Sequence, residues 1–475
     1  MLFSSLIFVF VFLPIVLTCH TLLKGTARNY FLLVASLVFY AWGEPKFVIV
    51  MMSSILMNYI FGRILEVASQ ASTRKLILVL AIVGNMSILF IFKYLNFAIS
   101  NIDKIFADLI PQTHIVLPIG ISFFTFQAMS YVIDVYRGHA HVQKNPFFLG
   151  LYISMFPQLI AGPIVRYTEI EQNIYDRHVS FDDFGEGARR FMIGFSKKII
   201  IANNLALVTD WAFESVSDGT ISTAGAWLGA ICYAMQIYFD FGGYSDMAIG
   251  LGRMLGFHYS ENFIYPYSKG SMKGFWTENH VSLCNWFRDY IYFPLGGSKC
   301  STIKTIRNML VVWGITGIWH GASWTFLIWG LVYFVILVIE KYLHLPERFK
   351  TKYGRLVWRL FILLMLVLLN GVLFRNIGFS PTLEYIGSMF MLTGCPMATP
   401  KFFYYAHSYG IIVVIGLIYA SSAFRAIKNR IVKDKSEQFI NIFSLIATVV
   451  YVILFIVSIS YIVMGSYNPF IYFNF

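Results

Sequence analysis

A histidine stands inside an apolar run of the chain, where the sequence reads Gly317-Ile318-Trp319-His320-Gly321. An ionisable side chain in such a run is expensive to bury, and it marks a functional site by default. Burial disfavours the charged form of an imidazole, so we expect a lowered pKa and a neutral ring. A neutral imidazole can take a proton from a hydroxyl, which makes His320 a candidate general base. A core histidine that bonds to one backbone carbonyl is the alternative.

A second histidine, His280, lies in residues 257–305, a stretch that is aromatic yet carries several charged side chains. Arg288 and Asp289 follow it by about two helical turns and are placed to pair with each other. Charged or irregular backbone at membrane depth is tolerated only where protein buries it or where it lines a wet cavity. We therefore expect short tilted or re-entrant helices around a polar chamber. An interfacial histidine that anchors an amphipathic helix is the alternative for His280.

The two histidines bracket this polar stretch, which predicts a buried reaction chamber between them. The candidates for its lining are polar or aromatic residues beside the histidines or at the ends of apolar runs: Asn279, Arg288, Asp289, Trp319 and Asp240. The sequence contains no GxSxG elbow, HExxH pair or phosphate-binding P-loop. The common catalytic motifs therefore do not identify the reaction. We expect no metal site, because a solvated loop explains His139 and His141 better than metal binding does.

Composition places these residues in a membrane protein. Hydrophobic residues make up 58% of the 475-residue chain and charged residues 13%, against roughly 45–50% and about 25% in soluble domains. Apolar runs of about 20 residues recur, the length of a spanning helix. This excludes a soluble globular protein, a disordered chain and a disulfide scaffold, and it disfavours a barrel of short alternating strands. Positive cytoplasmic loops explain the net charge of +12, so we expect no nucleic-acid partner.

The predicted fold class is all-α: a polytopic membrane protein with roughly ten to twelve transmembrane helices and short tilted or re-entrant helices around a central catalytic chamber. We interpret residues 1–475 as a single membrane domain. Residues 309–339 are too long for one straight span, and Gly314, Gly317 and Gly321 offer places for a break next to His320. The basic stretches at 341–359 and 425–435 are expected in the cytoplasm. Residues 465–475 then form an extracytoplasmic aromatic tail.

A series of segments along nearly the whole chain carries a family resemblance. These segments are LPIGISFFTFQ (117–127), FPQLIAGPI (156–164), residues 238–257, WFRDYIYFPLGG (286–297), WHG (319–321) and PFIYFNF (469–475). In this order they resemble the membrane-bound O-acyltransferase superfamily, and most closely its bacterial alginate O-acetylation branch. The resemblance implies that His280 and His320 match the two catalytic histidines of such proteins.

The resemblance also implies a reaction and its participants. The expected donor is cytoplasmic acetyl-CoA, a substrate rather than a permanently bound cofactor, and the expected acceptor is a hydroxyl of an extracytoplasmic polysaccharide, alginate or alginate-like first. The expected location is the inner membrane of a bacterium, with an extracytoplasmic SGNH-type transferase or esterase as partner. Tyr472 is similar to the tyrosine of a terminal aromatic motif in small proteins that accompany D-alanyl transfer, which implies an acyl relay. Docking of the partner and an aromatic membrane anchor are the alternatives for this tail.

Other functions stay open at this point. Related branches acetylate peptidoglycan or cellulose, or pass D-alanine toward teichoic acid. A secondary transporter or a flippase for lipid-linked sugars belongs to another class and also has many helices with buried ionisable residues. Release of free CoA from acetyl-CoA separates an acyltransferase from these two.

Overall fold

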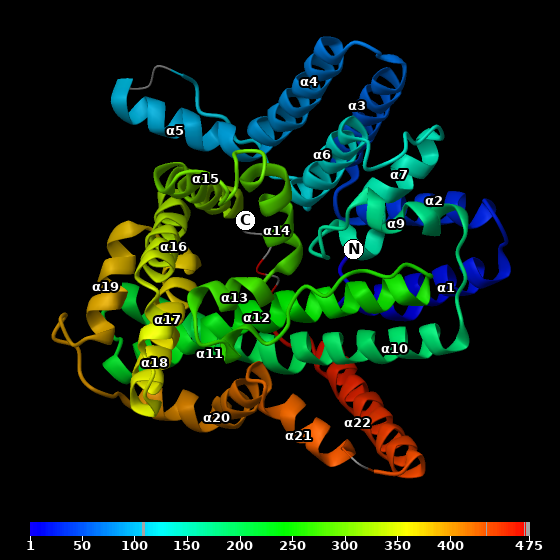
Figure 1. The fold of residues 1–475 in the computed structure, drawn as a ribbon. Helices are drawn as coiled ribbons and strands as arrows, with labels where there is room; N and C mark the ends of the chain where they lie inside the picture. The colour runs from blue at the N-terminus through cyan, green and yellow to red at the C-terminus, as the bar shows by residue number, and fades with distance from the viewer. Residues whose placement is uncertain (107–109, 434, 470, 472–475) are drawn as a thin grey trace. The chain divides into compact units, whose positions relative to one another are not determined.

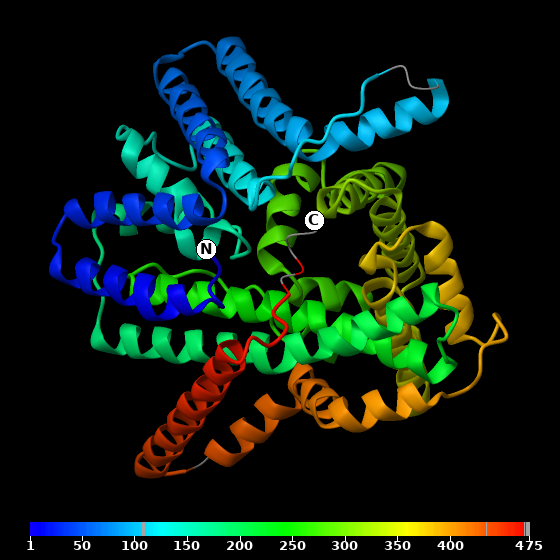
Figure 2. The ribbon, with the colours of Figure 1, turned by 180° about the vertical axis from the view of Figure 1, so that it is seen from behind.

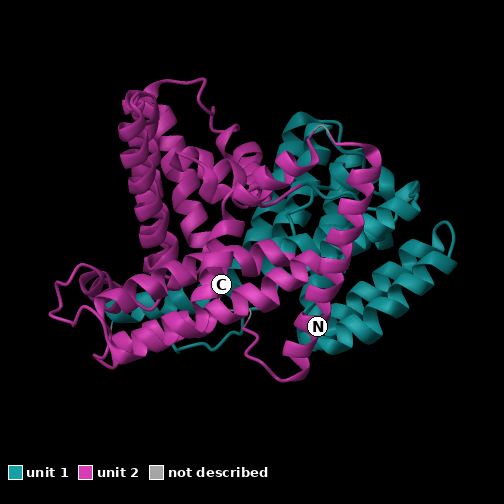
Figure 3. Cartoon of the chain, turned by 90° about the horizontal axis from the view of Figure 1, so that it is seen from below, with its two compact units in different colours: residues 1–191, 245–260 teal, residues 192–244, 261–475 magenta. Residues whose placement is uncertain are grey.

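The computed structural model describes residues 1–106, 110–433, 435–469 and 471 (Figures 1 and 2). Within these residues the secondary structure is helical, apart from one isolated antiparallel bridge between Phe263 and Asn279. The all-α prediction is confirmed. The chain separates into two compact units (Figure 3): unit 1 comprises Met1–Phe191 and Ser245–Ser260, and unit 2 comprises Met192–Tyr244 and Glu261–Phe475.

Unit 1 holds the N-terminal helices. In chain order they are η1 (Phe8–Phe12), α1 (Leu13–Leu22), α2 (Ala27–Gly43), η2 (Pro45–Phe47), α3 (Val48–Val67), α4 (Ala71–Leu89), η3 (Phe90–Tyr94), α5 (Leu95–Phe106), α6 (Ile121–Arg137), α7 (Pro146–Ser154), α8 (Phe156–Leu159) and α9 (Tyr167–Tyr175). The unit boundaries fall inside α10 (Phe181–Ser196) and near the C-terminal end of α12 (Thr223–Met254).

Unit 2 holds the remaining helices and those candidate site residues that the structure describes. In chain order they are η4 (Lys197–Ala202), α11 (Asn203–Ser217), η5 (Pro266–Ser268), α13 (Met272–Glu278), α14 (Val281–Phe287), η6 (Arg288–Tyr292), α15 (Thr302–His320), α16 (Trp324–Leu343), α17 (Leu345–Arg348), α18 (Lys352–Gly371), η7 (Leu373–Arg375), α19 (Phe379–Met389), α20 (Pro400–Ala420), α21 (Ala423–Val432) and α22 (Glu437–Val463).

Seven helical stretches in the described part of the chain are long and apolar enough to cross a membrane, which confirms the polytopic prediction. They are Pro45–Val67, Ala71–Phe106, Phe181–Ser217, Trp324–Leu343, Lys352–Arg375, Pro400–Ala420 and Glu437–Val463. The larger number expected from the sequence also counted shorter or more polar helices, such as Phe8–Leu22. In α20 and α22 only 6% of the most apolar window is buried by protein, so these helices need lipid to cover their side chains.

The break predicted within residues 309–339 falls beside His320. Helix α15 ends at His320 and α16 begins at Trp324, so the long apolar run folds into a helical hairpin. Ser323 caps α16, because its hydroxyl accepts the backbone N–H of Phe326 at 3.4 Å. The helices approach closely at Gly330, where a Cβ would collide with the backbone carbonyl of Trp313.

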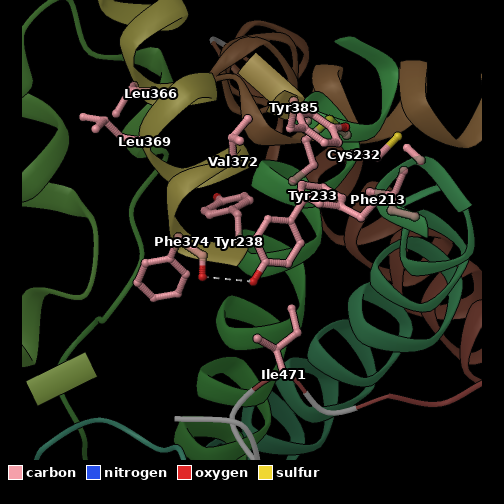
Figure 4. Close-up of a cluster of buried hydrophobic side chains, with 14 of the residues drawn as sticks. Phe213, Cys232, Tyr233, Tyr238, Leu366, Leu369, Val372, Phe374, Tyr385 and Ile471 are labelled. Atoms are coloured by element: carbon pink, nitrogen blue, oxygen red, sulfur yellow. Dashed lines mark hydrogen bonds between the residues drawn. The ribbon is translucent and has the colours of Figure 1, made fainter. Parts of the chain in front are cut away.

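The core of unit 2 is rich in aromatic side chains from distant parts of the sequence. Figure 4 shows Tyr233 and Tyr238 from α12 together with Phe374 from η7 and Tyr385 from α19. The Tyr233 hydroxyl donates to the backbone carbonyl of Phe374 at 3.5 Å. Ile471 of the C-terminal tail is buried in the same cluster. Ile471 is therefore part of the core of unit 2.

Candidate active site

His280 is held in an unusual backbone conformation between two short helices, α13 and α14. Its φ of 50° and ψ of 51° lie in the left-handed region, which costs an L-residue about 1–2 kcal/mol. Backbone hydrogen bonds hold the turn from both sides: the N–H of Ile264 donates to the Glu278 carbonyl at 2.9 Å, and the N–H of Val281 donates to the Asn262 carbonyl at 3.0 Å. Backbone strain that the surroundings enforce is typical of functional sites.

Asn262 orients the imidazole of His280. Its Oδ1 accepts the backbone N–H of Ser282 at 3.1 Å and the Ser282 hydroxyl at 3.0 Å, and it lies 3.3 Å from Nδ1 of His280. An amide oxygen only accepts, so Nδ1 carries the proton and Nε2 carries the lone pair. His280 lies outside the seven candidate spans, and burial lowers its pKa to about 3. The ring is therefore neutral at neutral pH.

Aromatic rings fix the second histidine. His320 is the last residue of α15 and is 6% exposed. Trp329 and Phe374 meet its ring nearly at right angles, each with a centroid distance of 5.0 Å. Trp319 contacts the His320 ring at 5.1 Å and the His280 ring at 6.1 Å. This packing restrains the rotation of both imidazoles.

The two histidines line the same cavity, which has a volume of about 50 Å³. Asp240, Asn279 and Asn370 add polar groups to its lining, and the first two of these were predicted there from the sequence. Aromatic rings form most of the remaining wall, and Ile471 of the tail completes it. One water needs roughly 10–15 Å³ of such space, so the cavity admits only a small reacting group.

The structure separates the other predicted lining residues from this cavity. Arg288 and Asp289 pair with each other, with Nε and Oδ1 2.7 Å apart, and Arg288 lines a neighbouring cavity instead. They begin η6 directly after α14, about two helical turns along the chain from His280. Trp319 is buried against the two histidines without lining the cavity. Tyr472 lies outside the described residues.

Two wider cavities of unit 2 adjoin the histidine cavity or each other through shared lining residues. Trp276 lines both the histidine cavity and a cavity of about 350 Å³. That second cavity shares Lys273 and Trp313 with a third cavity of about 610 Å³. Lys341 and His344, which belong to a stretch predicted to be cytoplasmic, line the third cavity. Shared lining residues therefore lead from the histidine cavity to a third cavity that carries both basic and acidic side chains.

The sequence analysis missed two polar groups of the site. Asn370 accepts the hydroxyl of Tyr333 at 2.9 Å and lines the histidine cavity. Lys198 pairs with Asp240, its Nζ 2.6 Å from Oδ1, and both side chains are almost fully buried. The signal for Lys198 was present, because a lysine within an apolar run is a candidate functional residue. Nothing in the local sequence connects it to Asp240, 42 residues away.

The sequence is similar to those of known membrane proteins over most of its length. Residues 124–345 match the membrane-bound O-acyltransferase family. The chain is 37% identical to the probable alginate O-acetylase AlgI of Azotobacter vinelandii over 100% of both chains. It is 41% identical to the probable alginate O-acetylase AlgI of Pseudomonas aeruginosa over 79% of this chain and 72% of the relative. It is also 30% identical to the peptidoglycan O-acetyltransferase of Helicobacter pylori over 100% and 98% of the two chains. His280 and His320 lie inside the matched range.

Proposed function

Because the chain belongs to the membrane-bound O-acyltransferase family and is an O-acyltransferase, we propose that it moves acetyl groups from cytoplasmic acetyl-CoA toward an extracytoplasmic alginate-like polysaccharide. The relatives at 37% and 41% identity are named for alginate, which supports this acceptor. The relative at 30% identity is named for peptidoglycan, the second candidate acceptor. The observation that carries the proposal is the meeting of His280 and His320 at one small cavity.

His320 is the general base in this proposal. Its imidazole takes the proton of the acceptor hydroxyl, and the hydroxyl oxygen attacks the thioester carbonyl carbon. The carbon–sulfur bond then breaks, and the CoA thiolate leaves with the electron pair. The proton held by His320 neutralises the thiolate, so the imidazole returns to its neutral form. His280, fixed by Asn262, orients the donor thioester or the acceptor in the same cavity.

The sizes and linings of the three cavities support acetyl-CoA as the donor. The cavity of about 610 Å³ is lined by Lys273 and Lys341, whose ammonium groups suit the phosphates of CoA, and also by the carboxylates of Glu340 and Glu347. The intermediate cavity is lined largely by apolar and aromatic side chains, among them Trp313. The histidine cavity of about 50 Å³ suits an acetyl group rather than a long acyl chain. Its small volume also limits water, which would hydrolyse the thioester.

The donor enters from the cytoplasm in this proposal, and the protein lies in the bacterial inner membrane. The basic stretches at 341–359 and 425–435 support this orientation, and Lys341 of the first stretch lines the widest cavity. The acceptor side then faces outward, where an SGNH-type partner would receive the acetyl group for the glycan.

Tyr472 is the proposed acyl relay of the tail. It follows Ile471 directly in the sequence, and Ile471 lines the histidine cavity. The phenol oxygen would attack the acetyl thioester while His320 takes the phenol proton, giving an acetyl ester on tyrosine and free CoA. A serine of the partner would then attack this ester and restore the tyrosine. Docking of the partner without covalent transfer is the second proposal for the tail.

The central test measures free CoA released from acetyl-CoA by the purified protein with its partner or a surrogate acceptor. We expect His320→Ala to lower the rate by about 10²–10⁴-fold, the contribution of a general base. His20→Ala is the matched control, because His20 is similarly buried but belongs to unit 1. CoA release that is unchanged in a folded His320→Ala protein would refute the proposal. Transport without thioester cleavage would favour a transporter or flippase.

Tyr472→Phe separates the two proposals for the tail, because it keeps the ring and removes only the nucleophile. A relay predicts loss of glycan acetylation and loss of acetyl-tyrosine from the C-terminal peptide by mass spectrometry. Docking alone predicts acetylation close to that of the parent protein.

A further inference from the structure

Hydrogen bonds along its described residues tie the C-terminal tail to unit 2. The hydroxyl of Tyr467 donates to Asp210 at 2.8 Å, and the side chain of Asn203 donates to that of Asn468 at 3.1 Å. At Pro469 and Ile471 the hydrogen bonds are to the main chain of the tail. Side chains of unit 2 therefore hold the main chain of the tail at Pro469 and Ile471.

These main-chain contacts come from the buried ion pair between Lys198 and Asp240. The Nζ of Lys198 donates to the backbone carbonyl of Pro469 at 2.7 Å. The N–H of Ile471 donates to Oδ2 of Asp240 at 3.1 Å, while Oδ1 of the same carboxylate faces Lys198. Nζ also donates to Asn203 at 3.2 Å, so the three donors of the ammonium meet three acceptors within unit 2.

The donor and the acceptor of the ion pair match the hydrogen-bonding groups that the main chain of the tail presents to them. An ammonium only donates and a carboxylate only accepts, so the lysine binds a carbonyl and the aspartate binds an N–H two residues further on. Lys198 lies in η4, a π-helical turn inside a long helical stretch, and such turns are frequent at functional sites. A buried ion pair is weak evidence of stability, because desolvation offsets the attraction. Its contacts with the tail give it another role.

The tail residue that the pair holds is part of the histidine cavity. Ile471 is 7% exposed and lines that cavity together with Asp240, His280 and His320. Figure 4 shows Ile471 in the buried cluster that also contains Tyr238. Loss of the tail from this place would open the cavity wall beside the reacting groups.

We propose that Lys198 and Asp240 form a positioning site that binds the main chain of the C-terminal tail and keeps Ile471 in the wall of the histidine cavity. Acetyl transfer depends on this placement. The inference rests on acetyl transfer taking place in the histidine cavity, but it does not require Tyr472 to carry the acetyl group. The competing explanation is that the ion pair only joins η4 to α12. The two explanations predict different results when the charges are removed or exchanged.

The first test replaces both charges in the full-length protein, as Lys198→Met with Asp240→Leu. Apolar replacement of a whole buried ion pair is often neutral for stability, so the variant is expected to fold while the tail loses its anchors. The tail is followed in an Ile471→Cys background, by the rate of maleimide labelling of the C-terminal peptide measured by mass spectrometry. Activity is followed as CoA release and glycan acetylation, with kcat and KM determined separately.

We expect labelling of the thiol introduced at position 471 to be at least about tenfold faster in the double variant, because a protected thiol becomes exposed. We expect kcat to fall by about 10²-fold, the typical cost of misplacing groups around a reaction centre, with little change in the KM for acetyl-CoA. Arg190→Met is the control, because it breaks the Arg190–Asp246 ion pair of unit 1. Slow labelling or parental kcat in the double variant would overturn the proposal.

The second test exchanges the charges, as Lys198→Asp with Asp240→Lys. This restores opposite charges but reverses donor and acceptor toward the tail, so we expect fast labelling and low kcat again. Protection and activity restored together would mean that the pair only joins η4 to α12. Failure of the acetyltransferase proposal would give a different result. The parent protein would then release no CoA, while the thiol at position 471 would still be labelled faster in the double variant than in the parent.

Discussion

Replacement of Asn262 by leucine tests whether His280 works through its orientation. Asn262 is fully buried, and its Oδ1 lies within hydrogen-bond distance of Nδ1 of His280 and of both donors of Ser282. Leucine fills a similar volume but offers no acceptor. The change therefore removes the group that selects the tautomer and fixes the ring, while both catalytic candidates stay in place.

The structure sets the size of the effect. His280 is 3% exposed, so solvent replaces the lost acceptor poorly, and a buried donor without an acceptor costs about 1–3 kcal/mol. Ser282 is half-buried, so water can accept some of the hydrogen bonds that its N–H and hydroxyl lose. This cost is smaller than a typical free energy of unfolding of about 5–15 kcal/mol, so the variant is expected to stay folded. Partners that orient the histidine ligands of metals contribute about 10–100-fold. Asn262 orients His280 in the same way, so we expect kcat to fall by a similar factor with KM for acetyl-CoA nearly unchanged.

The assay is CoA release by the purified protein, with thermal unfolding in the same detergent as the check on folding. Asn58→Leu is the matched control: Asn58 is also fully buried and bonds to Asn85 at 3.0 Å, but it belongs to unit 1. It is expected to lose stability without losing kcat. Parental kcat in a folded Asn262→Leu protein would refute the orienting role of Asn262.

Asn262→Asp extends this test to pH. The carboxylate keeps an acceptor at the same place but stabilises the imidazolium, so it raises the pKa of His280 from about 3. The neutral imidazole is then lost as pH falls through the raised pKa, and the acidic limb of the kcat profile should move to higher pH. Identical profiles for the parent and the variant would contradict a role for neutral His280.

Three further predictions concern the cavities and the helical hairpin. Trp276→Ala should remove a side chain that lines both the histidine cavity and the cavity of about 350 Å³, and so raise the kcat/KM ratio of propionyl-CoA to acetyl-CoA by about 10-fold or more. An unchanged ratio would show that Trp276 does not set donor length. Lys273→Glu with Lys341→Glu should raise the KM for acetyl-CoA several-fold at low salt and less at high salt, and an unchanged KM would place the CoA phosphates elsewhere. Gly330→Ala should destabilise the protein by about 1–3 kcal/mol, since its Cβ would meet the Trp313 carbonyl; thermal unfolding measures this, and parental stability would refute the close crossing.

The sequence alone determined the class of the protein and the weak point in its longest apolar run. Apolar content of 58% leaves too little polar surface for a soluble fold. The run at 309–339 is too long to cross a bilayer as one straight helix, and Gly321 marks where it folds back. His320 could be singled out because a buried ionisable group is costly wherever it lies. These conclusions depend on local composition, which the sequence displays directly.

Only the tertiary structure decided which residues share the cavity. Arg288 and Asp289 are close to His280 in sequence but pair with each other, whereas Asn370 and Ile471 are distant in sequence and line the cavity. The left-handed turn at His280 was also hidden, because hydrogen bonds from another segment enforce it. The ion pair in η4 and α12 meets the tail across 271 residues of chain. Such contacts are set by how helices pack, and spacing along the chain does not encode which helices become neighbours.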